Sequence, residues 1–600
     1  MQKEENKLII NIIKGVLYIA PFFLGWYGIY QLGEGDWLEC AYKSVQLYLM
    51  EYSVETKPIN LALTIAKVAA PLVTAAFLVS FLYSMVENLQ IWWRLKKKDV
   101  VVFHGDSANI DLVQKKLGDR AIVSERPKVF QAEKHVLMFN EDVDMYHFID
   151  KNGAELLHEK NKTVFLCSEK ILRGCYESSN IVVCNVAENC ARTYWQQYPI
   201  RMRNGENGPE FVDEKILLIG FDNYAQRLLT QAILKNVVSD SSAIEYHVCG
   251  RFSNSEVSVE NDEYASYLDT HMMLHKAVNV KKVSADGTER DYRPRETICE
   301  NYDTVYFHEA SWQRVMGRGV EFDRIIICKD LDAENMEILN ELKTFFVVDT
   351  CHIKYTDKKI LEQLWDCEKD NIYTFGVNVE LYDPDVILKE TLFRQAMMIH
   401  GRYYAKYVCQ GIIHGEYCDN QVTEELFDKE GNILINEDTG KQSKTVKEIK
   451  CLGKCVDCPK LKKDWAAQNN FIRYSNVAQA DHIPEKIRIL LGPDVSMDTE
   501  NVNKMIVKAY EALKPLNDPL LETEQEKKQK MAKLHALWKI EHIRWDRYHF
   551  MNNWDYAEQR DKKRRKHHLL VRYEELSLEE QRKDEDTYLS LGEILASENQ

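Results

Sequence analysis

Two segments of the chain place a glycine directly after a short apolar run, the arrangement with which strand-to-helix turns bind phosphate groups. The second reads G-x-D-x-x-A, with Gly220, Asp222 and Ala225 in the three positions and Arg251 after the following strand, placed to meet a phosphate. Asp222 replaces a glycine, so a carboxylate would face the pyrophosphate. The first segment keeps only Gly105. These five residues are the predicted cofactor-binding residues for a nucleotide or dinucleotide; for Gly105, a degenerate module used as scaffold is the alternative.

Three cysteines form a second group with ligand chemistry. Cys451, Cys455 and Cys458 follow a C-x3-C-x2-C spacing within a polar stretch. A zinc ion would need a fourth ligand, for which Cys418 or His414 is available. The same spacing occurs at iron–sulfur sites of radical SAM enzymes, but no barrel follows here. A zinc site and unligated loop thiols are therefore the two interpretations that stay open.

The C-terminal part carries an aromatic stripe with a carboxylate in it. Trp538, Glu541 and Trp545 fall on one face of a predicted helix. The aromatic side chains fit a packed core, whereas a buried Glu541 needs a partner. Arg572 or Arg473 is the expected partner.

A basic run from Arg560 to His568 lies in the same region. A solvated loop is one interpretation, and attraction of nucleotide phosphates or anionic lipid heads is the other. No serine-nucleophile elbow, P-loop or H-E-x-x-H motif occurs, so the chain is not expected to be an enzyme.

The elements that must position these residues alternate between strands and helices. Short apolar runs separated by helical stretches indicate βαβ units on parallel sheets. Strands are predicted at Val100–His104, Ala121–Ser124, His135–Phe139, Thr163–Cys167, Ile181–Val186, Ile216–Gly220, Glu245–Val248, Thr304–Phe307, Arg324–Cys328 and Phe345–Val348. The predicted domains are 1–98, a transmembrane hairpin; 99–205 and 206–400, two α/β modules; 401–464, a linker with the cysteine-bearing insertion; and 465–600, a mainly helical domain.

The first hundred residues have the composition of a membrane hairpin. Leu8–Tyr30 and Leu61–Val86 are each long enough to cross a bilayer, with Lys14 and Lys67 as their only charges. An intramembrane lysine faces an interior, a cavity or a partner, or it snorkels to the interface. The basic residues after the second span place both termini in the cytoplasm.

The connection between the predicted spans has its own pattern. Leu38, Tyr42, Val45 and Leu49 recur at helical spacing, which predicts an interfacial, re-entrant or amphipathic helix. Two spans around a short helix are typical of potassium-channel pores, but the filter sequence of such pores is absent. A selective potassium pore is therefore not expected.

Composition excludes some partners. The 600 residues hold 78 Lys+Arg and 94 Asp+Glu, a net charge of −16. This charge argues against nucleic-acid binding, which needs cations for the phosphate backbone. The 15 cysteines in so long a chain argue for reduced thiols in a reducing compartment.

The order of membrane segment, basic junction and strand–glycine–helix modules resembles proteins with TrkA-N or potassium-conductance-regulator (RCK) domains. The resemblance covers roughly residues 99–400. It implies Rossmann-like modules that form ligand-gated rings beneath transporters and channels. The predicted fold class is therefore a two-helix transmembrane hairpin, then two Rossmann-like doubly wound α/β modules, then a mainly α C-terminal domain.

The C-terminal domain resembles the RyR domain, the repeat of ryanodine receptors that also occurs in many bacterial proteins. The shared pattern is E-H-x-x-W, an aromatic turn, and H-x-x-L-x-x-Y-x-x-L; Asn553 departs from it where glycine is usual. The resemblance implies ligand recognition more than catalysis. The predicted ligand pocket or core comprises Trp538, Glu541, His542, Trp545, Trp554 and Tyr573.

These features predict a membrane-embedded effector or channel that senses a small, nucleotide-derived ligand and assembles as a homo-oligomer in the cell membrane. By analogy of architecture, its setting would be bacterial antiviral defence or ion transport. A membrane-anchored nucleotide-processing or NAD(P)-dependent enzyme is one alternative, and a ligand-free membrane scaffold is another.

Overall fold

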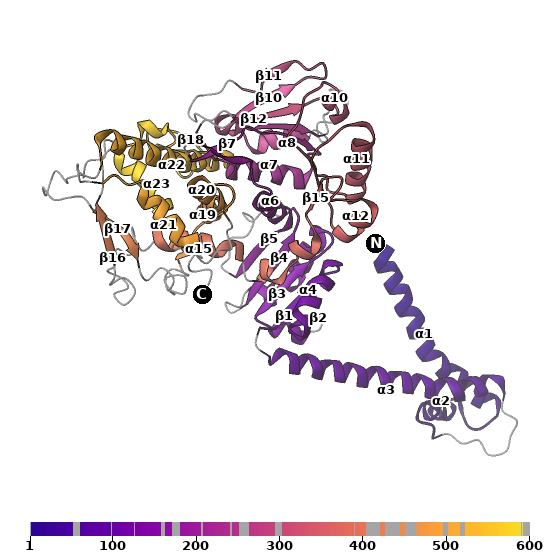
Figure 1. The fold of residues 1–600 in the computed structure, drawn as a ribbon. Coiled ribbons are helices and arrows are strands. Elements are labelled where there is room, and N and C mark those ends of the chain that lie inside the picture. Colours follow the sequence, from indigo (N-terminus) through magenta and orange to yellow (C-terminus); the bar gives the residue numbers. More distant parts are fainter. Residues whose placement is uncertain are drawn as a thin grey trace. The chain divides into compact units, whose positions relative to one another are not determined.

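The computed structural model forms two compact units, residues 1–100 with 124–132 and residues 101–123 with 133–600 (Figure 1). The described residues are 2–51, 60–97, 99–124, 127–157, 162–170, 180–205, 208–240, 243–250, 263–293, 303–388, 391–403, 421–425, 444–449, 464–465, 467–495, 502–516, 522–589, 591 and 594.

The first unit consists of helices. They are α1 (Gln2–Gln31), α2 (Trp37–Gln46), η1 (Leu47–Leu49), α3 (Leu61–Leu95) and η3 (Pro127–Gln131). Glycines let α1 approach its neighbours closely, since a Cβ on Gly28 would lie 2.7 Å from Leu63 N and one on Gly25 would lie 2.5 Å from Ser44 Oγ. Small residues serve this purpose where helices pack in membranes.

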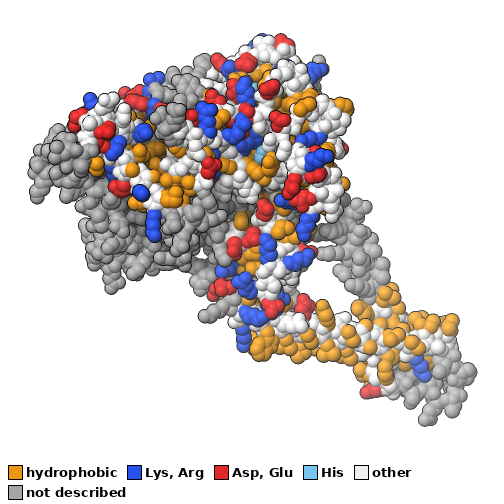
Figure 2. All heavy atoms as spheres, viewed as in Figure 1, with side chains coloured by type: hydrophobic (Ala, Val, Ile, Leu, Met, Phe, Trp, Pro, Cys, Tyr) orange, Lys and Arg blue, Asp and Glu red, His pale blue; other side chains and the backbone are white. Residues whose placement is uncertain are grey.

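Among the described residues, α3 is the one helix long and apolar enough to cross a membrane, with a mean hydropathy of 2.0 in its most apolar stretch. Most of its side chains are exposed, and Figure 2 shows hydrophobic atoms covering the face in view. Lys67 is half-buried on this helix. The side chain of Lys14 lies outside the described residues, so the first predicted span stays a prediction.

The connection between α1 and α3 contains the predicted amphipathic helix. Asp36 caps α2 by accepting hydrogen bonds from Leu38 N and Glu39 N. The apolar residues that suggested the helix are about half to two-thirds exposed; they are Leu38, Tyr42, Val45 and Leu49. An apolar helix face left uncovered by its own unit fits contact with a bilayer interface.

The second unit begins with a parallel five-stranded sheet in the order β2-β1-β3-β4-β5. Its strands are β1 (Val101–His104), β2 (Ala121–Val123), β3 (Lys134–Met138), β4 (Thr163–Ser168) and β5 (Ile181–Asn185). Its helical elements are α4 (Asn109–Leu117), η2 (Gly118–Arg120), α5 (Asp142–Leu157) and α6 (Val186–Gln197). The five predicted strands are confirmed to within one residue at every end, because each is a mainly apolar run buried in the sheet.

A second sheet of eight strands follows, in the order β11-β10-β12-β9-β8-β13-β14-β15, with only β11 antiparallel. Its strands are β8 (Lys215–Ile219), β9 (Glu245–Cys249), β10 (Asn279–Val283), β11 (Glu289–Asp291), β12 (Thr304–His308), β13 (Arg324–Ile327), β14 (Cys351–Lys354) and β15 (Ile372–Phe375). Its helices are α7 (Asn223–Lys235), α8 (Glu263–Thr270), α9 (Leu274–Ala277), α10 (Trp312–Met316), α11 (Asp332–Phe345), α12 (Lys358–Leu364), α13 (Asn378–Leu381) and α14 (Pro384–Leu388). The strands β6 (Met202–Gly205) and β7 (Gly208–Phe211) form a hairpin before it.

One predicted strand of this sheet is wrong. The apolar run Phe345–Val348 contains the end of α11, and both Phe345 and Val347 are largely exposed. The strand is instead β14, whose four residues are buried between β13 and β15. The sequence Cys-His-Ile-Lys does not indicate a buried strand, because His352 and Lys354 are polar residues. Both are nevertheless buried there.

The remainder is mainly helical, in agreement with the predicted composition of residues 465–600. The elements are α15 (Thr391–Tyr403), β16 (Gln421–Glu425), β17 (Lys444–Ile449), α19 (Asn470–Asp481), α20 (Ile483–Leu491), α21 (Val502–Ala512), α22 (Glu524–Met551), β18 (Asp555–Tyr556), β19 (Lys566–His567), η7 (Tyr573–Glu575) and α23 (Leu578–Leu589). Thr523 and Glu526 form a capping box at the start of α22.

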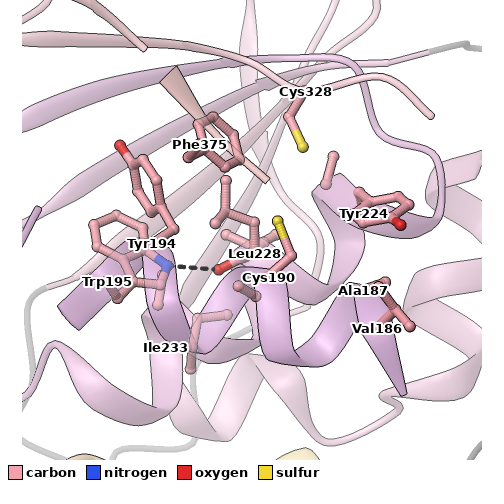
Figure 3. Close-up of a cluster of buried hydrophobic side chains, with 14 of the residues drawn as sticks. Val186, Ala187, Cys190, Tyr194, Trp195, Tyr224, Leu228, Ile233, Cys328 and Phe375 are labelled. Atoms are coloured by element: carbon pink, nitrogen blue, oxygen red, sulfur yellow. Dashed lines mark hydrogen bonds between the residues drawn. The ribbon is translucent and has the colours of Figure 1, made fainter. Parts of the chain in front are cut away.

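One hydrophobic core joins the two sheets and the helical region. It extends from Val101 in β1 through α6 and α7 to Trp554. Figure 3 shows the part of this core to which α6 contributes, where Trp195 Nε1 donates to the Leu228 carbonyl at 2.9 Å. The predicted domains 99–205, 206–400 and 465–600 thus share buried side chains.

Candidate functional site

A cavity of about 740 Å³ lies where four parts of the second unit converge. Its lining comes from α6, α7, the α8 end and the C-terminal region. The residues are Glu188, Arg227, Thr270, His271, Asn469, Asn470, Phe471, Ile472, Tyr474, Tyr548, Met551, Asn552, Asn553, Trp554, Arg560, Lys562 and Arg565. Its volume falls in the range of small-molecule sites.

One wall of the cavity is aromatic. Phe471 and Trp554 stack with ring centroids 4.9 Å apart, and Tyr548 packs on Phe471 at 5.1 Å. The Tyr548 hydroxyl donates to the Phe471 carbonyl at 2.6 Å, which fixes the first turn of α19 on α22. Trp554 and Tyr548 are buried, whereas Phe471 is partly exposed, so Phe471 is the ring of this wall on which a planar ligand can stack.

Four cationic side chains also line the cavity. Arg560, Lys562 and Arg565 form an exposed rim on the loop between β18 and β19, and Arg565 Nη1 donates to the Asn552 carbonyl at 2.8 Å. Arg227 of α7 is half-buried, and the described residues supply it with no hydrogen-bond or ion-pair partner. A guanidinium that has no partner among the described residues is free to donate to an anion in the cavity.

The rim loop is anchored to the second module. Lys276 and Lys566 each bind the Asp555 carboxylate at 2.6 Å. Partial burial would raise the pKa of Asp555, but these two hydrogen-bonded lysines hold it at about 2. The carboxylate is therefore charged at neutral pH, and the basic rim is held in place.

Two of the neutral residues in the lining are His271 and Asn553. His271 bonds through Nδ1 to the Met551 carbonyl at 2.8 Å; burial lowers the pKa of His271 despite this bond, and nearby Arg227 adds to the effect. Asn553 has a left-handed backbone, φ 60°, and its amide donates to the Thr270 carbonyl, while its Oδ1 is buried without a partner. The cavity thus offers aromatic, cationic and amide groups together.

Of the six residues predicted for the C-terminal pocket or core, Trp554 lines the cavity. Trp538, Tyr573 and most of the others pack elsewhere. The Trp538 indole donates to the Tyr510 hydroxyl at 3.0 Å, the His535 imidazole bonds to the Tyr573 hydroxyl, and His542 Nε2 donates to the Val571 carbonyl. Trp545 packs on His549 at 3.9 Å, one layer beneath the cavity wall.

Glu541 is fully buried, but its expected partners Arg572 and Arg473 are wrong. Its carboxylate binds Arg544 in a bidentate pair at 2.6–3.1 Å and Lys486 at 2.7 Å. Burial would raise the pKa of Glu541, yet these two cations hold it at about 2. The predicted stripe therefore combines a buried, charged carboxylate with aromatic side chains of the core.

Gly105 and Gly220 follow β1 and β8, the strands at which each sheet reverses its strand order, and doubly wound folds usually bind ligands at such points. Gly105 has φ 130°, and a Cβ there would lie 1.9 Å from the Met138 carbonyl. Gly220 has φ 103°, and a Cβ would lie 2.4 Å from the Cys328 carbonyl. Both turns require glycine because the chain itself crosses closely at this point.

At the second crevice the chain supplies its own anions. Asp330 Oδ1 accepts from Tyr224 N in the first turn of α7, and Asp222 Oδ2 accepts from Asp330 N and lies 3.4 Å from Lys329. Burial and the Asp222 carboxylate raise the pKa of Asp330. A phosphate arriving here would meet two carboxylates. Ala225 is buried in the core.

Two groups of predicted ligands are not placed. Arg251 and the cysteines 451, 455 and 458 lie outside the described residues, so their roles stay predictions. Within the described part of the chain, no group of three or more His, Cys, Asp or Glu side chains is arranged to hold a metal.

No model of a known protein family matches the chain, and no curated protein matches it. A solved structure named "GsuK Channel" is similar over 75% of this chain and 97% of its own, at 11% identity and a TM-score of 0.26. A TM-score this low does not establish a shared fold.

The sequence indicated part of this cavity. The basic run supplied the rim, and the RyR resemblance supplied Trp554. The sequence did not indicate Arg227, Glu188 and Phe471, because nothing in their local sequence shows that α6, α7 and α19 converge.

Proposed function

We propose that the chain is a membrane-embedded, ligand-responsive effector or channel, and that the cavity holds its ligand, a small nucleotide-derived molecule. One observation carries the proposal. The half-buried Arg227, which has no hydrogen-bond or ion-pair partner among the described residues, lines the same cavity as the ring of Phe471, which stacks on Trp554.

This pairing of groups fits a nucleotide. Stacking on an aromatic side chain accepts any base, because every base has a π-face. Arginine binds phosphate oxygens in bidentate fashion. With the three rim cations, Arg227 gives the cavity an excess of positive charge in a chain whose net charge is −16.

The membrane part of the proposal rests on α3 and on sequence pattern. Two spans with cytoplasmic termini would place the cavity in the cytoplasm. Two helices cannot enclose a water path, so a channel would require a homo-oligomer. Antiviral defence and ion transport are the proposed settings.

The test is a thermal-shift screen of the full chain in detergent against ATP, GTP, CTP, UTP, NAD and cyclic di-AMP. A ligand at 100 times its Kd stabilises the folded state by about 2.7 kcal/mol, which gives a clear shift. Failure of every member to shift the melting temperature contradicts the proposal. Chromatography of the bound nucleotide tests the enzyme alternative, which requires a product.

Arg227→Gln sharpens the test because its two effects have opposite signs. Removing an unpaired, half-buried guanidinium should leave the ligand-free melting temperature unchanged or raise it. The same change should weaken nucleotide binding by about 1.5–3 kcal/mol, the value of a charged hydrogen bond. Arg290→Gln, which removes an exposed charge from β11, is the control and should alter neither quantity.

A further inference from the structure

We propose that α6 transmits occupancy of the cavity to the first sheet, and that Glu188 is the contact through which it does so. The inference rests on the proposed function and adds the route by which a ligand acts. It begins from the charge of Glu188, the sole carboxylate among the described residues of the lining.

Glu188 would bind a different part of a ligand than the four cations of the lining do. A carboxylate only accepts hydrogen bonds, so it takes ribose hydroxyls or base amino groups and repels phosphates. Its backbone N donates to Asn185 Oδ1 at 2.8 Å, and Asn185 is both the cap of α6 and the last residue of β5. A pull on Glu188 therefore acts at the junction of α6 and the first sheet.

One turn further along α6 lies a buried connection to the helical region. Arg192 is 1% exposed and donates to the Asp481 carboxylate of α19 at 2.6–3.0 Å. Gln231 of α7 donates to the same carboxylate at 2.9 Å. Glu188 interacts electrostatically with Arg192, so a ligand that engages Glu188 also changes the field at this three-helix junction.

The far end of α6 is held by the second module. Trp195 Nε1 donates to the Leu228 carbonyl, and Lys235 Nζ donates to the Trp195 carbonyl at 2.6 Å. Because this end of α6 is fixed, a displacement at the Glu188 end moves β5. Packed cores switch between discrete arrangements, which converts a small shift into a movement of a whole element.

The first sheet leads towards the membrane segment along the chain. Its order places β5 beside β4, then β3, then β1. Only residues 96–100 separate β1 from the apolar helix α3. The first sheet is thus the part of the second unit that is covalently nearest to α3.

Hydrogen–deuterium exchange of the full chain in detergent tests the inference. The probe is whichever nucleotide of the panel gives the largest thermal shift, and pyrophosphate, which has no hydroxyl or base, is the control ligand. With the nucleotide, peptides covering the cavity, β5 and β1 should exchange more slowly. With pyrophosphate, protection should stay at the cations.

Glu188→Gln separates binding from transmission. The nucleotide affinity should fall by less than about tenfold, a loss of under about 1.4 kcal/mol, while protection of β5 and β1 is largely lost. Glu155→Gln on the exposed surface of α5 should behave as wild type. Glu188→Asp is the second variant, and it should restore part of the response because the charge returns.

Two results would overturn the inference: nucleotide protection confined to the cavity in the wild type, or a full β5 response in Glu188→Gln. Absence of any thermal shift in the wild type is a different result and contradicts the proposed function itself.

Discussion

Phe471 combines three roles that make it the most informative side chain of the cavity. Its ring stacks on Trp554, its carbonyl accepts the Tyr548 hydroxyl, and it stands in the first turn of α19. Only the ring of Phe471 would contact a ligand. A substitution can therefore remove the ring while the backbone contacts of this residue stay.

Phe471→Leu should therefore weaken nucleotide binding with little effect on the fold. Loss of a stacking ring costs about 1–3 kcal/mol per base, and isothermal titration calorimetry measures the change. Tyr556→Leu removes an exposed ring from the neighbouring strand β18, outside the cavity lining, and is the control. Equal affinities for wild type and Phe471→Leu would show that no base stacks here.

Buried histidines give the second unit a defined response to acid. His352 in β14 packs among Tyr194, Tyr198 and Tyr373, and burial, with Arg324 adding to it, lowers its pKa to about 3. The unfolded state binds a proton below about pH 6.5, whereas the folded state stays neutral. Stability is therefore full above that pH and falls as the pH drops towards 3.

His352→Phe should flatten that acid dependence. Each pH unit between about 6.5 and 3 costs about 1.4 kcal/mol per such histidine, so melting temperatures from pH 7 to 4 should fall less steeply in the variant. His147→Phe changes an exposed histidine of α5 and should follow the wild-type profile. Parallel profiles for wild type and His352→Phe would show that this histidine is protonated in the folded state.

At the scale of elements, α22 fastens the helical region to the second sheet through buried charges. Arg547 donates to Asp303 at 2.7 Å and to the Ile233 carbonyl at 2.9 Å, and neither charged side chain is exposed. Buried pairs add little net stability, but losing one partner leaves an uncompensated charge.

Arg547→Met should lower stability by about 3–5 kcal/mol, and adding Asp303→Asn should recover part of that loss. A double-mutant cycle on melting temperatures measures the coupling. The exposed pair Arg203–Glu210 in the β6–β7 hairpin should give only about 0.2–1 kcal/mol in the same cycle. A coupling at Arg547–Asp303 as small as this would mean that the two groups are solvated.

The same elements show how much the sequence could predict. Strands such as β1, β4 and β8 were predictable because parallel strands buried on both faces are continuous apolar runs. β14 was missed because its His352 and Lys354 are buried through tertiary contacts. The sequence indicated the basic rim and Trp554 but not the rest of the cavity, since Glu188, Arg227 and Phe471 come from segments that only the fold brings together.

At the scale of the whole molecule, the chain combines an apolar helix that its own unit leaves uncovered with a cavity elsewhere in the sequence. The core that runs from β1 to Trp554 means that the cavity is built on the same packed interior as the first sheet. Within the second unit, ligand binding is therefore coupled to the packing of the first sheet.

Insertion of α3 can be tested by placing a charge near its middle. Leu78→Arg should lower the membrane-bound fraction, because an arginine at the centre of a span costs roughly 2.5–3.5 kcal/mol. Leu78 is about half exposed, so the first unit itself should tolerate the change. Val347→Arg, at an exposed apolar residue of the second unit, is the control in the same membrane fractionation and should leave the fraction unchanged.

Lys67 distinguishes a channel from a membrane-anchored sensor. It is the charge predicted within the α3 span, and it is half-buried there. If an oligomer encloses a water path, a lysine at such depth faces that path and repels cations. Lys67→Ala should then change nucleotide-stimulated ion flux in liposomes while the nucleotide affinity stays at the wild-type value.

Thr64→Ala, a neutral substitution at an exposed site one turn away, is the control and should alter neither quantity. Flux that is absent from the wild type, although the nucleotide binds, would contradict the channel and leave an anchored sensor whose output is a partner protein.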